Sequence, residues 1–260
     1  MKISIITVVY NNPKVFEALD SILSQRLEED DNLELIVIDG GSNDGTVEIL
    51  EKYRNRIDVL LSEPDDGIYD AMNKGIKVSD GDIIGTLNSD DIYQDEASLS
   101  AILQSFKESD AQIVFGDLVY VRETDPSVIV RYWKSRPYTE GLFERGWMPP
   151  HPTFFVRKQV YLDHGCFDLR FRLASDFELT MRFLAKAKVL SLYIPRIIVR
   201  MRMGGATNNS LINILKGNLE SYRACKKNNL KVSLLFVVFK ILSRIPQFFK
   251  RPNAVIMEKQ

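Results

Sequence analysis

The feature that most constrains the fold is a repeated alternation of short apolar segments with helical patterns in the first 95 residues. The apolar segments are rich in Ile, Val and Leu, as expected for parallel strands that are buried on both faces of a sheet. Each of the first three is followed by a helix, and Asn12 is expected to cap the first helix, with Pro13 at its first position. The expected strands are residues 3–9, 33–38, 59–61 and 83–87, and the helices between them are residues 13–23, 47–53 and 68–78.

This alternation predicts an α/β fold with a Rossmann-like, mostly parallel central sheet and right-handed crossovers. From residue 96 onward the order of strands and helices becomes mixed. We therefore expect one domain over residues 1–209, made of a ligand-binding half (1–95) and a mixed half (96–209), followed by a helical extension over 210–260. The later elements are expected as helices at 97–108 and 211–228, and as strands at 113–117, 128–133, 153–156, 189–194 and 197–203.

Carboxylates follow three of the expected strands, at Asp39, at Asp65-Asp66 and at Asp90-Asp91. The carboxyl ends of parallel strands meet at one crevice, so these acids are expected to converge there. Adjacent carboxylates repel each other unless a cation compensates, which favours a divalent metal bound by Asp90 and Asp91. The alternative is that this pair only caps the next helix.

Two other uses of such a crevice are disfavoured by the sequence. A dinucleotide site needs glycines after the first strand, where this chain has Tyr10-Asn11-Asn12-Pro13. A phosphatase with an aspartyl nucleophile needs a second carboxylate two residues beyond Asp39, where Gly41 stands.

The charge of the chain is uneven. Residues 226–251 carry seven Lys or Arg and no acid, so the formal net charge of −1 leaves −8 on the remainder. Apolar residues recur at helical spacing over residues 230–249, with Lys231, Lys240, Arg244, Lys250 and Arg251 around them. This pattern predicts a basic amphipathic helix on an anionic membrane surface. The alternative is a terminal helix that packs on the body with a solvated basic face.

Several motifs resemble those of the inverting family 2 glycosyltransferases of the GT-A fold. They run in the family's order from residue 3 to about residue 203, and the likeness is greatest to members that build bacterial surface polysaccharides. The motifs are Ile5-Ile6-Thr7-Val8-Val9-Tyr10-Asn11, Val37-Ile38-Asp39-Gly40-Gly41-Ser42, Pro64-Asp65-Asp66-Gly67, Asn73-Lys74-Gly75, Asn88-Ser89-Asp90-Asp91, His151-Pro152 and Ser175-Asp176.

The resemblance implies a role for particular residues on the donor side. Thr7, Tyr10 and Asp39 would hold the nucleotide base and ribose, and Asp66 and Asn73 would line the same pocket. The divalent metal, Mn²⁺ or Mg²⁺, would be bound by Asp90 with Asp91 as a supporting or alternative ligand. Asn88 stands where the family usually has the first acid of its metal motif, in the same nucleotide-sugar site.

On the acceptor side, the resemblance implies that Asp176 is the catalytic base. Its alternative is a helix cap, and Ser175 replaces an acid that the family often has before the base. His151, between two prolines, is expected to contact the diphosphate, the metal or the acceptor, or to be a plain loop residue. Trp147 is expected to stack on an acceptor sugar or to belong to the core.

The expected function is therefore inverting transfer of a sugar from a nucleotide-diphosphate donor, with a UDP-sugar favoured. The acceptor would be a saccharide or polyprenyl-linked saccharide at the cytoplasmic face of a membrane, and no nucleic-acid partner is expected. An inactive sugar-nucleotide-binding scaffold is the main alternative. A nucleotidyltransferase is disfavoured, because no Gly- and Arg-rich loop follows the first strand.

Overall fold

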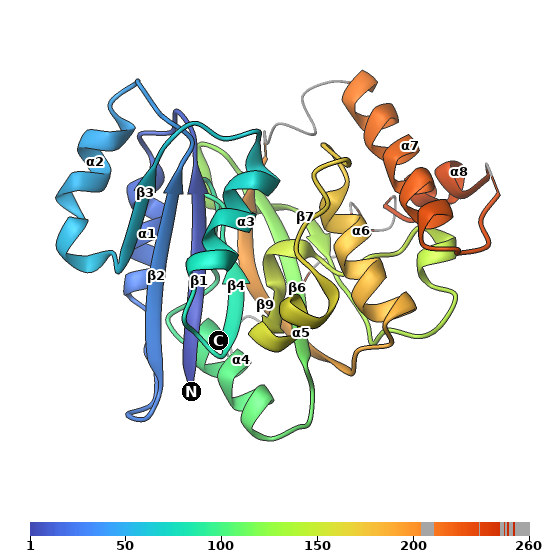
Figure 1. The fold of residues 1–260 in the computed structure, drawn as a ribbon, viewed down its shortest axis with the longest axis horizontal. Helices are drawn as coiled ribbons and strands as arrows, with labels where there is room; N and C mark the ends of the chain where they lie inside the picture. Colours follow the sequence, from blue (N-terminus) through green and yellow to red (C-terminus); the bar gives the residue numbers. More distant parts are fainter. Residues whose placement is uncertain (204–210, 234, 245–246, 248, 250–251, 253–260) are drawn as a thin grey trace.

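The computed structural model describes residues 1–203, 211–233, 235–244, 247, 249 and 252. The described chain forms a single mixed sheet of nine strands in the order β3-β2-β1-β4-β8-β6-β9-β5, with β7 paired to β6 (Figure 1). Its strands are β1 (Lys2–Val9), β2 (Asn32–Asp39), β3 (Val59–Ser62), β4 (Ile83–Thr86), β5 (Ile92–Tyr93), β6 (Ile113–Arg122), β7 (Asp125–Trp133), β8 (Phe154–Arg157) and β9 (Ser191–Arg202).

The first four long strands are parallel, as the sequence predicts. β1 lies between β2 and β4, and β3 pairs with the outer edge of β2. β8 pairs antiparallel with β4 and β6, and this is where the mixed second half begins. The expected α/β class with a mostly parallel sheet is confirmed.

Helices cover both faces of the sheet (Figure 1). On one face, α1, α2 and α4 pack on apolar residues of β1, β2 and β4, while α3, α5, α6, α7 and α8 share the core of the other face. The helices are α1 (Val15–Leu23), α2 (Thr46–Lys52), α3 (Ile68–Val78), α4 (Ser98–Lys107), α5 (Lys158–His164), α6 (Ser175–Met181), α7 (Leu211–Lys227) and α8 (Leu235–Leu242), with short helical turns η1 (Arg54–Arg56), η2 (Phe143–Arg145), η3 (His151–Thr153) and η4 (Arg182–Lys186).

The structure differs from the predicted elements in several places. The first helix begins at Val15 rather than at Pro13, because the Asn12 side chain bonds to Ser89 and to the Lys14 amide. The two strands expected over 189–203 are one strand, β9, whose pairing with β6 shifts register around Pro195. Proline has no N–H to donate, so a break in the pairing is expected there. The two-residue strand β5 was not predicted.

Helix α8 is shorter than the helix expected over 230–249, and Lys240, the charged residue within it, is buried instead of exposed. Phe236 and Lys240 are buried, while Leu235, Val238, Phe239 and Leu242 are exposed. The Lys240 ammonium bonds to the Ser221 hydroxyl and lies 4.1 Å from the centroid of the Phe177 ring. Lys240 therefore belongs to the interior, and Lys250 and Arg251 lie outside the described residues. None of the described helices has the length and apolar composition needed to cross a membrane.

The buried Lys240 ammonium predicts a specific pH dependence of stability. Burial is the main cause that lowers the pKa of Lys240 from 10.5 to about 7; Arg244 lowers it further, and Asp176 and Cys225 oppose the shift. The unfolded chain therefore binds a proton that the folded chain releases, and stability rises with pH between these two values. Between pH 7 and pH 9, the free energy of unfolding of the wild type should rise by on the order of 2 kcal/mol more than that of Lys240→Met, as measured by urea unfolding.

A matched control is Lys52→Met, because Lys52 is exposed on α2. This variant should follow the wild-type pH curve. Parallel curves for the wild type and Lys240→Met would contradict the assignment of the shifted pKa to Lys240.

Candidate active site

The loops that follow β1, β2 and β4 are joined to one another at the carboxyl edge of the sheet. The Asn12 side-chain amide donates to the carbonyl and the hydroxyl of Ser89, at 3.2 and 3.0 Å. The side-chain Oδ1 of Asn11 accepts from the backbone amide of Asn43 at 3.0 Å, and the backbone amide of Asn11 donates to the Ser42 hydroxyl at 2.8 Å. The acids that end these strands are therefore held around one crevice, as expected for parallel strands.

Asp39 is the best anchored of the predicted donor-side residues. It is fully buried at the end of β2, and its carboxylate accepts the Ser42 amide and the hydroxyls of Ser42 and Ser62. The Ser62 bond, at 2.6 Å, links the ends of β2 and β3. This network fixes the direction of the carboxylate before any ligand is present.

Gly40 lets the Asp65 carboxylate approach the Tyr10 ring. A Cβ at position 40 would lie 2.5 Å from Asp65 Oδ2 and 3.4 Å from a ring carbon of Tyr10. Tyr10 is exposed and Asp65 is half-buried. Asp66 is exposed, and its amide donates to the Asp70 carboxylate. Asp65, rather than the predicted Asp66, therefore has its carboxylate beside Tyr10. A sequence motif alone does not show which of two adjacent acids in a loop faces a given side chain.

Two further predicted residues are engaged in the protein itself. Thr7 is fully buried in β1, and its hydroxyl has no hydrogen-bond partner among the described residues. The Asn73 side chain both donates to the Phe167 carbonyl and accepts from the Phe167 amide, each at 2.9 Å. Asn73 thus connects α3 to the segment before α6. A direct contact of either residue with a nucleotide stays a prediction.

Asp90 and Asp91 follow β4, with Asp91 fully buried and Asp90 half-buried. Burial raises the pKa of Asp90, and burial together with the adjacent Asp90 charge raises the pKa of Asp91 well above its ordinary value. The Asn88 amide donates to Asp91 Oδ2 at 3.1 Å. Asn88 Oδ1 and Asp91 Oδ1 are buried without a partner among the described residues.

These oxygens fit a divalent cation of the Mg²⁺ or Mn²⁺ kind. Among the described residues there is no group of three or more His, Cys, Asp or Glu side chains suited to hold a metal. Mg²⁺ commonly uses only one or two carboxylates and takes its other ligands from water and substrate phosphates. The Asp90 and Asp91 carboxylates, with Asp91 Oδ1 and the neighbouring Asn88 Oδ1 buried and unpartnered among the described residues, match that donor set.

Asp176 lies in the first turn of α6, half-buried. Its Oδ1 accepts the Tyr69 hydroxyl at 3.1 Å and the Phe177 amide at 2.8 Å. Burial and the Asp176 charge raise the pKa of Tyr69 well above its ordinary value, so the phenol stays protonated and donates. Tyr69 also stacks on Phe167, with ring centroids 5.3 Å apart. The carboxylate is thus oriented from the α3 side of the molecule.

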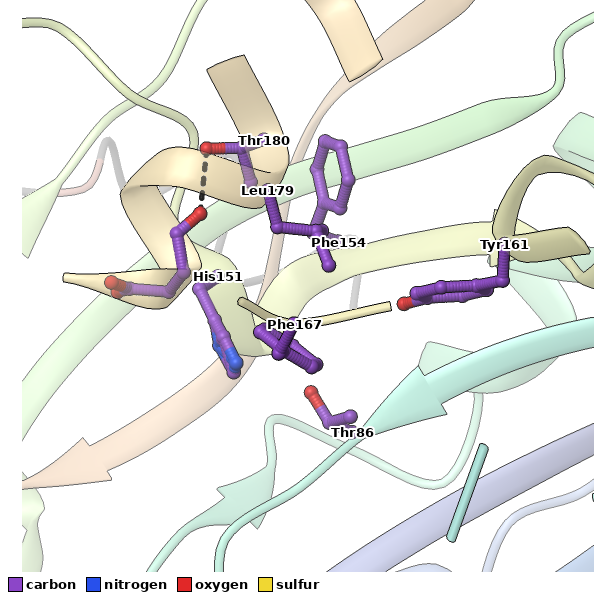
Figure 2. A pocket seen from close by; sticks show the side chains of 8 residues that line it. Thr86, His151, Phe154, Tyr161, Phe167, Leu179 and Thr180 are labelled. Carbon is purple, nitrogen blue, oxygen red and sulfur yellow. Dashed lines mark hydrogen bonds between the residues drawn. The ribbon is translucent and has the colours of Figure 1, made fainter. Parts of the chain in front are cut away.

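His151 and Asp176 line the same small cavity, which has a volume of about 10 Å³ and lies beside Thr86 at the end of β4 (Figure 2). Such a space suits a water molecule rather than a sugar. Burial lowers the pKa of His151, and Asp176 partly opposes this effect. The imidazole is therefore neutral near pH 7, and its buried Nε2 has no partner in the described chain.

Trp147 lies away from this cavity. It packs against Phe115, Tyr138 and Phe143, and it lines a second cavity together with Trp133. The sequence suggested proximity to His151 because the two are four residues apart, but the chain turns away through Met148, Pro149 and Pro150. Stacking of Trp147 on an acceptor stays a prediction.

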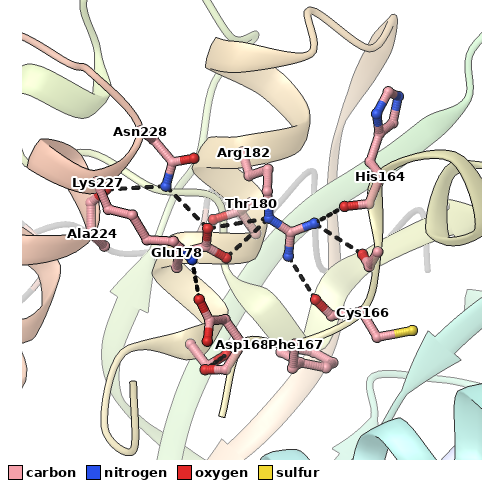
Figure 3. Close-up of polar contacts among 12 residues, drawn as sticks. His164, Cys166, Phe167, Asp168, Glu178, Thr180, Arg182, Ala224, Lys227 and Asn228 are labelled. Carbon is pink, nitrogen blue, oxygen red and sulfur yellow. Dashed lines mark hydrogen bonds and ion pairs between the residues drawn. The ribbon is translucent and has the colours of Figure 1, made fainter. Parts of the chain in front are cut away.

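A polar network that the sequence did not predict supports the start of α6 (Figure 3). The fully buried Glu178 carboxylate accepts from Arg182 at 3.1 Å and from the Asn228 amide at 3.0 Å. Arg182 also donates to the carbonyls of His164, Gly165 and Cys166, and so fixes the loop that leads to Phe167. The i, i+4 spacing of Glu178 and Arg182 was the available signal.

This mostly parallel sheet, with carboxylates after β2 and β4 and Asp176 in the first turn of α6, has the GT-A fold of sugar-transferring enzymes. The model of the family "Glycosyl transferase family 2" matches residues 4–172. The chain belongs to this family, and it is a glycosyltransferase.

Several known proteins are similar to this chain. A PGL/p-HBAD biosynthesis glycosyltransferase of Mycobacterium bovis is 26% identical over 215 residues, covering 81% of this chain and 80% of the relative. Residues 1–349 of S. aureus TarS superpose with a TM-score of 0.66 at 19% identity, covering 94% and 71%; that fragment is also known with UDP and with UDP-GlcNAc. The mannosyltransferase PcManGT of Pyrobaculum calidifontis, in complex with GDP-Man and Mn²⁺, superposes with a TM-score of 0.63 at 15% sequence identity. The match covers 93% of this chain and 68% of PcManGT.

The link between Asn73 and Phe167 gives a test of how the segment before α6 is held. Asn73→Ala removes both hydrogen bonds and leaves a backbone amide and carbonyl without their partner. We expect the free energy of unfolding to fall by about 1–3 kcal/mol in urea titrations. Asn55→Ala, at an exposed position of η1, should have no measurable effect.

Equal stability of the two variants would contradict this structural role. Loss of nucleotide affinity without loss of stability in Asn73→Ala would instead support the direct nucleotide contact that the sequence predicts.

Proposed function

We propose that this chain is an inverting, metal-dependent glycosyltransferase that uses a UDP-sugar and a lipid-linked saccharide acceptor. The observation that carries the proposal is the placement of the carboxylates. Asp39 ends β2 and Asp90 and Asp91 follow β4 at the carboxyl edge of parallel strands, while Asp176, in the first turn of α6, lines a small cavity together with Thr86 at the end of β4. This placement suits a donor site that lies near a general base.

On the donor side, we assign Asp39 and Tyr10 to the nucleoside, with Thr7, Asp66, Asn73 and Asn88 as further predicted contacts. Asp39 is already oriented by Ser42 and Ser62, so little ordering is needed on binding. We add Asp65 to this set because its carboxylate lies beside Tyr10. The complexes of TarS with UDP and UDP-GlcNAc favour uridine as the base.

Asp90, with Asp91 and Asn88 Oδ1 behind it, would hold the divalent metal. When bound, Mn²⁺ or Mg²⁺ offsets the negative charge that develops on the departing nucleoside diphosphate. The complex of PcManGT with Mn²⁺ supports this choice for a related fold. Because the pKa values of both carboxyls are raised, metal affinity should increase as the pH rises and the competing protons leave.

Asp176 would take the proton from the acceptor hydroxyl as its oxygen attacks the anomeric carbon from the side opposite the diphosphate. The result of this single displacement is inversion at that carbon. Tyr69 and the Phe177 amide both donate to Oδ1, so Oδ2 is the oxygen that we assign to the acceptor. The neutral His151 imidazole, with its unpartnered Nε2, would hydrogen-bond the diphosphate or the acceptor from the adjacent wall.

The proposed acceptor class and membrane association rest on α8. Four apolar side chains of this helix are 49–60% exposed, at Leu235, Val238, Phe239 and Leu242. Lys231 is exposed just before the helix, and Arg244 is half-buried just after it. An apolar face flanked by cations suits the boundary of an anionic lipid surface. This would bring the crevice to lipid-linked saccharides of the cell envelope on the cytoplasmic side.

The donor assignment predicts metal-dependent hydrolysis of one sugar nucleotide in the absence of acceptor. In a panel of UDP-, GDP- and dTDP-sugars, we expect slow turnover of a UDP-sugar with Mn²⁺ and none with chelator. Asp90→Ala should lower this rate by at least about 100-fold, because the metal supplies several kcal/mol of charge stabilisation. Asp110→Ala, at an exposed acid before β6, should match the wild type.

Metal-independent turnover, or full activity of Asp90→Ala, would contradict the metal assignment. Metal-dependent nucleotide binding without turnover, even when an acceptor is present, would favour the inactive scaffold that the sequence left as the alternative.

The base assignment predicts different losses for two substitutions. Asp176→Asn should lower kcat for transfer by about 10²–10⁴-fold while leaving UDP affinity unchanged. Tyr69→Phe should lower kcat about tenfold, with KM for the donor unchanged, because it loses only the bond that orients Asp176. Transfer by Asp176→Asn at the wild-type rate, or a retained anomeric configuration in the product's NMR spectrum, would exclude this mechanism.

A further inference from the structure

A second and much larger cavity lies between the end of β7, the loop after η2 and helix α8. Its volume is about 390 Å³. It is lined by Trp133 and the three residues that follow β7, by residues 145–148, and by Lys240, Ser243, Arg244 and Gln247. The residues assigned above to the donor and the base include none of these side chains; Trp147 alone was predicted, to stack on an acceptor.

The lining of this cavity is cationic. It contains Lys134, Arg136, Arg145, Lys240 and Arg244, and no carboxylate. None of these five side chains takes part in an ion pair within the described residues. The nearest acid in sequence, Glu144, does not line the cavity. Five basic side chains around one space, none of them in an ion pair within the described residues, favour an anionic ligand.

Two buried polar groups of the lining lack the partners that a ligand would supply. The Ser135 side chain is 5% exposed, and its hydroxyl has no hydrogen-bond partner in the described part of the chain. Lys240 is 4% exposed, and its ammonium bonds only to the neutral Ser221 hydroxyl. Buried polar groups are normally paired, so an unpaired hydroxyl and an ammonium that hydrogen-bonds a neutral hydroxyl at one cavity indicate a built site.

The surroundings of the cavity indicate what kind of anion it takes. The Lys240 ammonium lies 4.1 Å from the Phe177 ring, and Phe177 follows Asp176 directly. Phe143 packs between the rings of Phe177 and Trp147, at 5.6 and 5.4 Å between centroids. On one side, only the aromatic rings of Phe143 and Phe177 separate the cavity from the first turn of α6, which carries Asp176. Another side is formed by α8, whose apolar face is exposed.

We infer that this cavity binds the diphosphate group of an amphiphilic, lipid-linked acceptor. Ser135, Lys240 and Arg244 would bond the phosphate oxygens, and the exposed cations Lys134, Arg136 and Arg145 would attract the anion from solution. The lipid chain would follow the apolar side chains of α8. This inference rests on the proposed function, since it names the acceptor of that transfer.

Both tryptophans of the chain line this cavity, so intrinsic fluorescence reports its occupancy directly. We would titrate the full chain with farnesyl diphosphate, with inorganic pyrophosphate and with UDP. The variants are Arg244→Gln and Ser135→Ala, and the control is Lys52→Gln, which removes an exposed cation of α2 at the far end of the molecule (Figure 1). Circular dichroism of each variant checks that it is folded.

Farnesyl diphosphate should change the fluorescence and bind more tightly than pyrophosphate. Arg244→Gln should weaken its binding about tenfold, as expected for one lost hydrogen bond to a charged group, and Ser135→Ala should weaken it less. Lys52→Gln should bind as the wild type does, and UDP should not compete.

Unchanged affinity in both cavity variants would overturn the inference. Equal affinity for pyrophosphate and farnesyl diphosphate would overturn the lipid-linked acceptor in favour of a soluble diphosphate. Competition by UDP would show that the cavity binds the donor nucleotide and would also overturn the inference. Metal-dependent donor hydrolysis by the wild type, measured in the same buffer, reports the proposed function separately. Its absence alongside cavity-dependent binding would overturn the acceptor role and not the anion site.

Discussion

The pairing of β1 with β2 on one side and β4 on the other is the constraint on which the active site depends. All three strands run in the same direction, so their carboxyl ends and the loops beyond them lie along one edge. Asn11 and Asn12 then join the loop after β1 to the loops after β2 and β4 through side-chain hydrogen bonds. Asp39 and Asp90 are thereby brought to one crevice from positions far apart in the sequence.

Several polar groups of the two candidate sites are buried without a hydrogen-bond partner among the described residues, and a ligand would supply one. Asp91 is fully buried beside a second carboxylate, and its Oδ1 lacks a partner among the described residues. The same holds for Ser135 in the second cavity, and Lys240 there has no anionic neighbour in the lining. Burying such groups costs stability unless a partner arrives, so their positions indicate binding rather than structural roles.

Much of the fold followed from sequence because the apolar strand pattern and the helical stripes of residues 3–87 correspond to β1 to β4 and α1 to α3. The resemblance in motifs also indicated the family before the structure was considered. The predictions that were wrong concern features that tertiary contacts determine. Lys240 turned inward because it shares a helix face with the buried Phe236, and β9 is continuous because pairing with β6 resumes after Pro195. Nothing in the sequence placed Tyr69 against Asp176, since the two are 107 residues apart.

The central claim is that the carboxyl ends of β1, β2 and β4 form a metal-dependent nucleotide site. Calorimetric titration of UDP into the wild type and Asp39→Asn, with Mn²⁺ or with chelator, tests it most directly. The account predicts that UDP binds the wild type only with Mn²⁺ and that Asp39→Asn, although folded, binds at least about tenfold more weakly. Equal UDP affinity in both proteins, or binding indifferent to Mn²⁺, would contradict it.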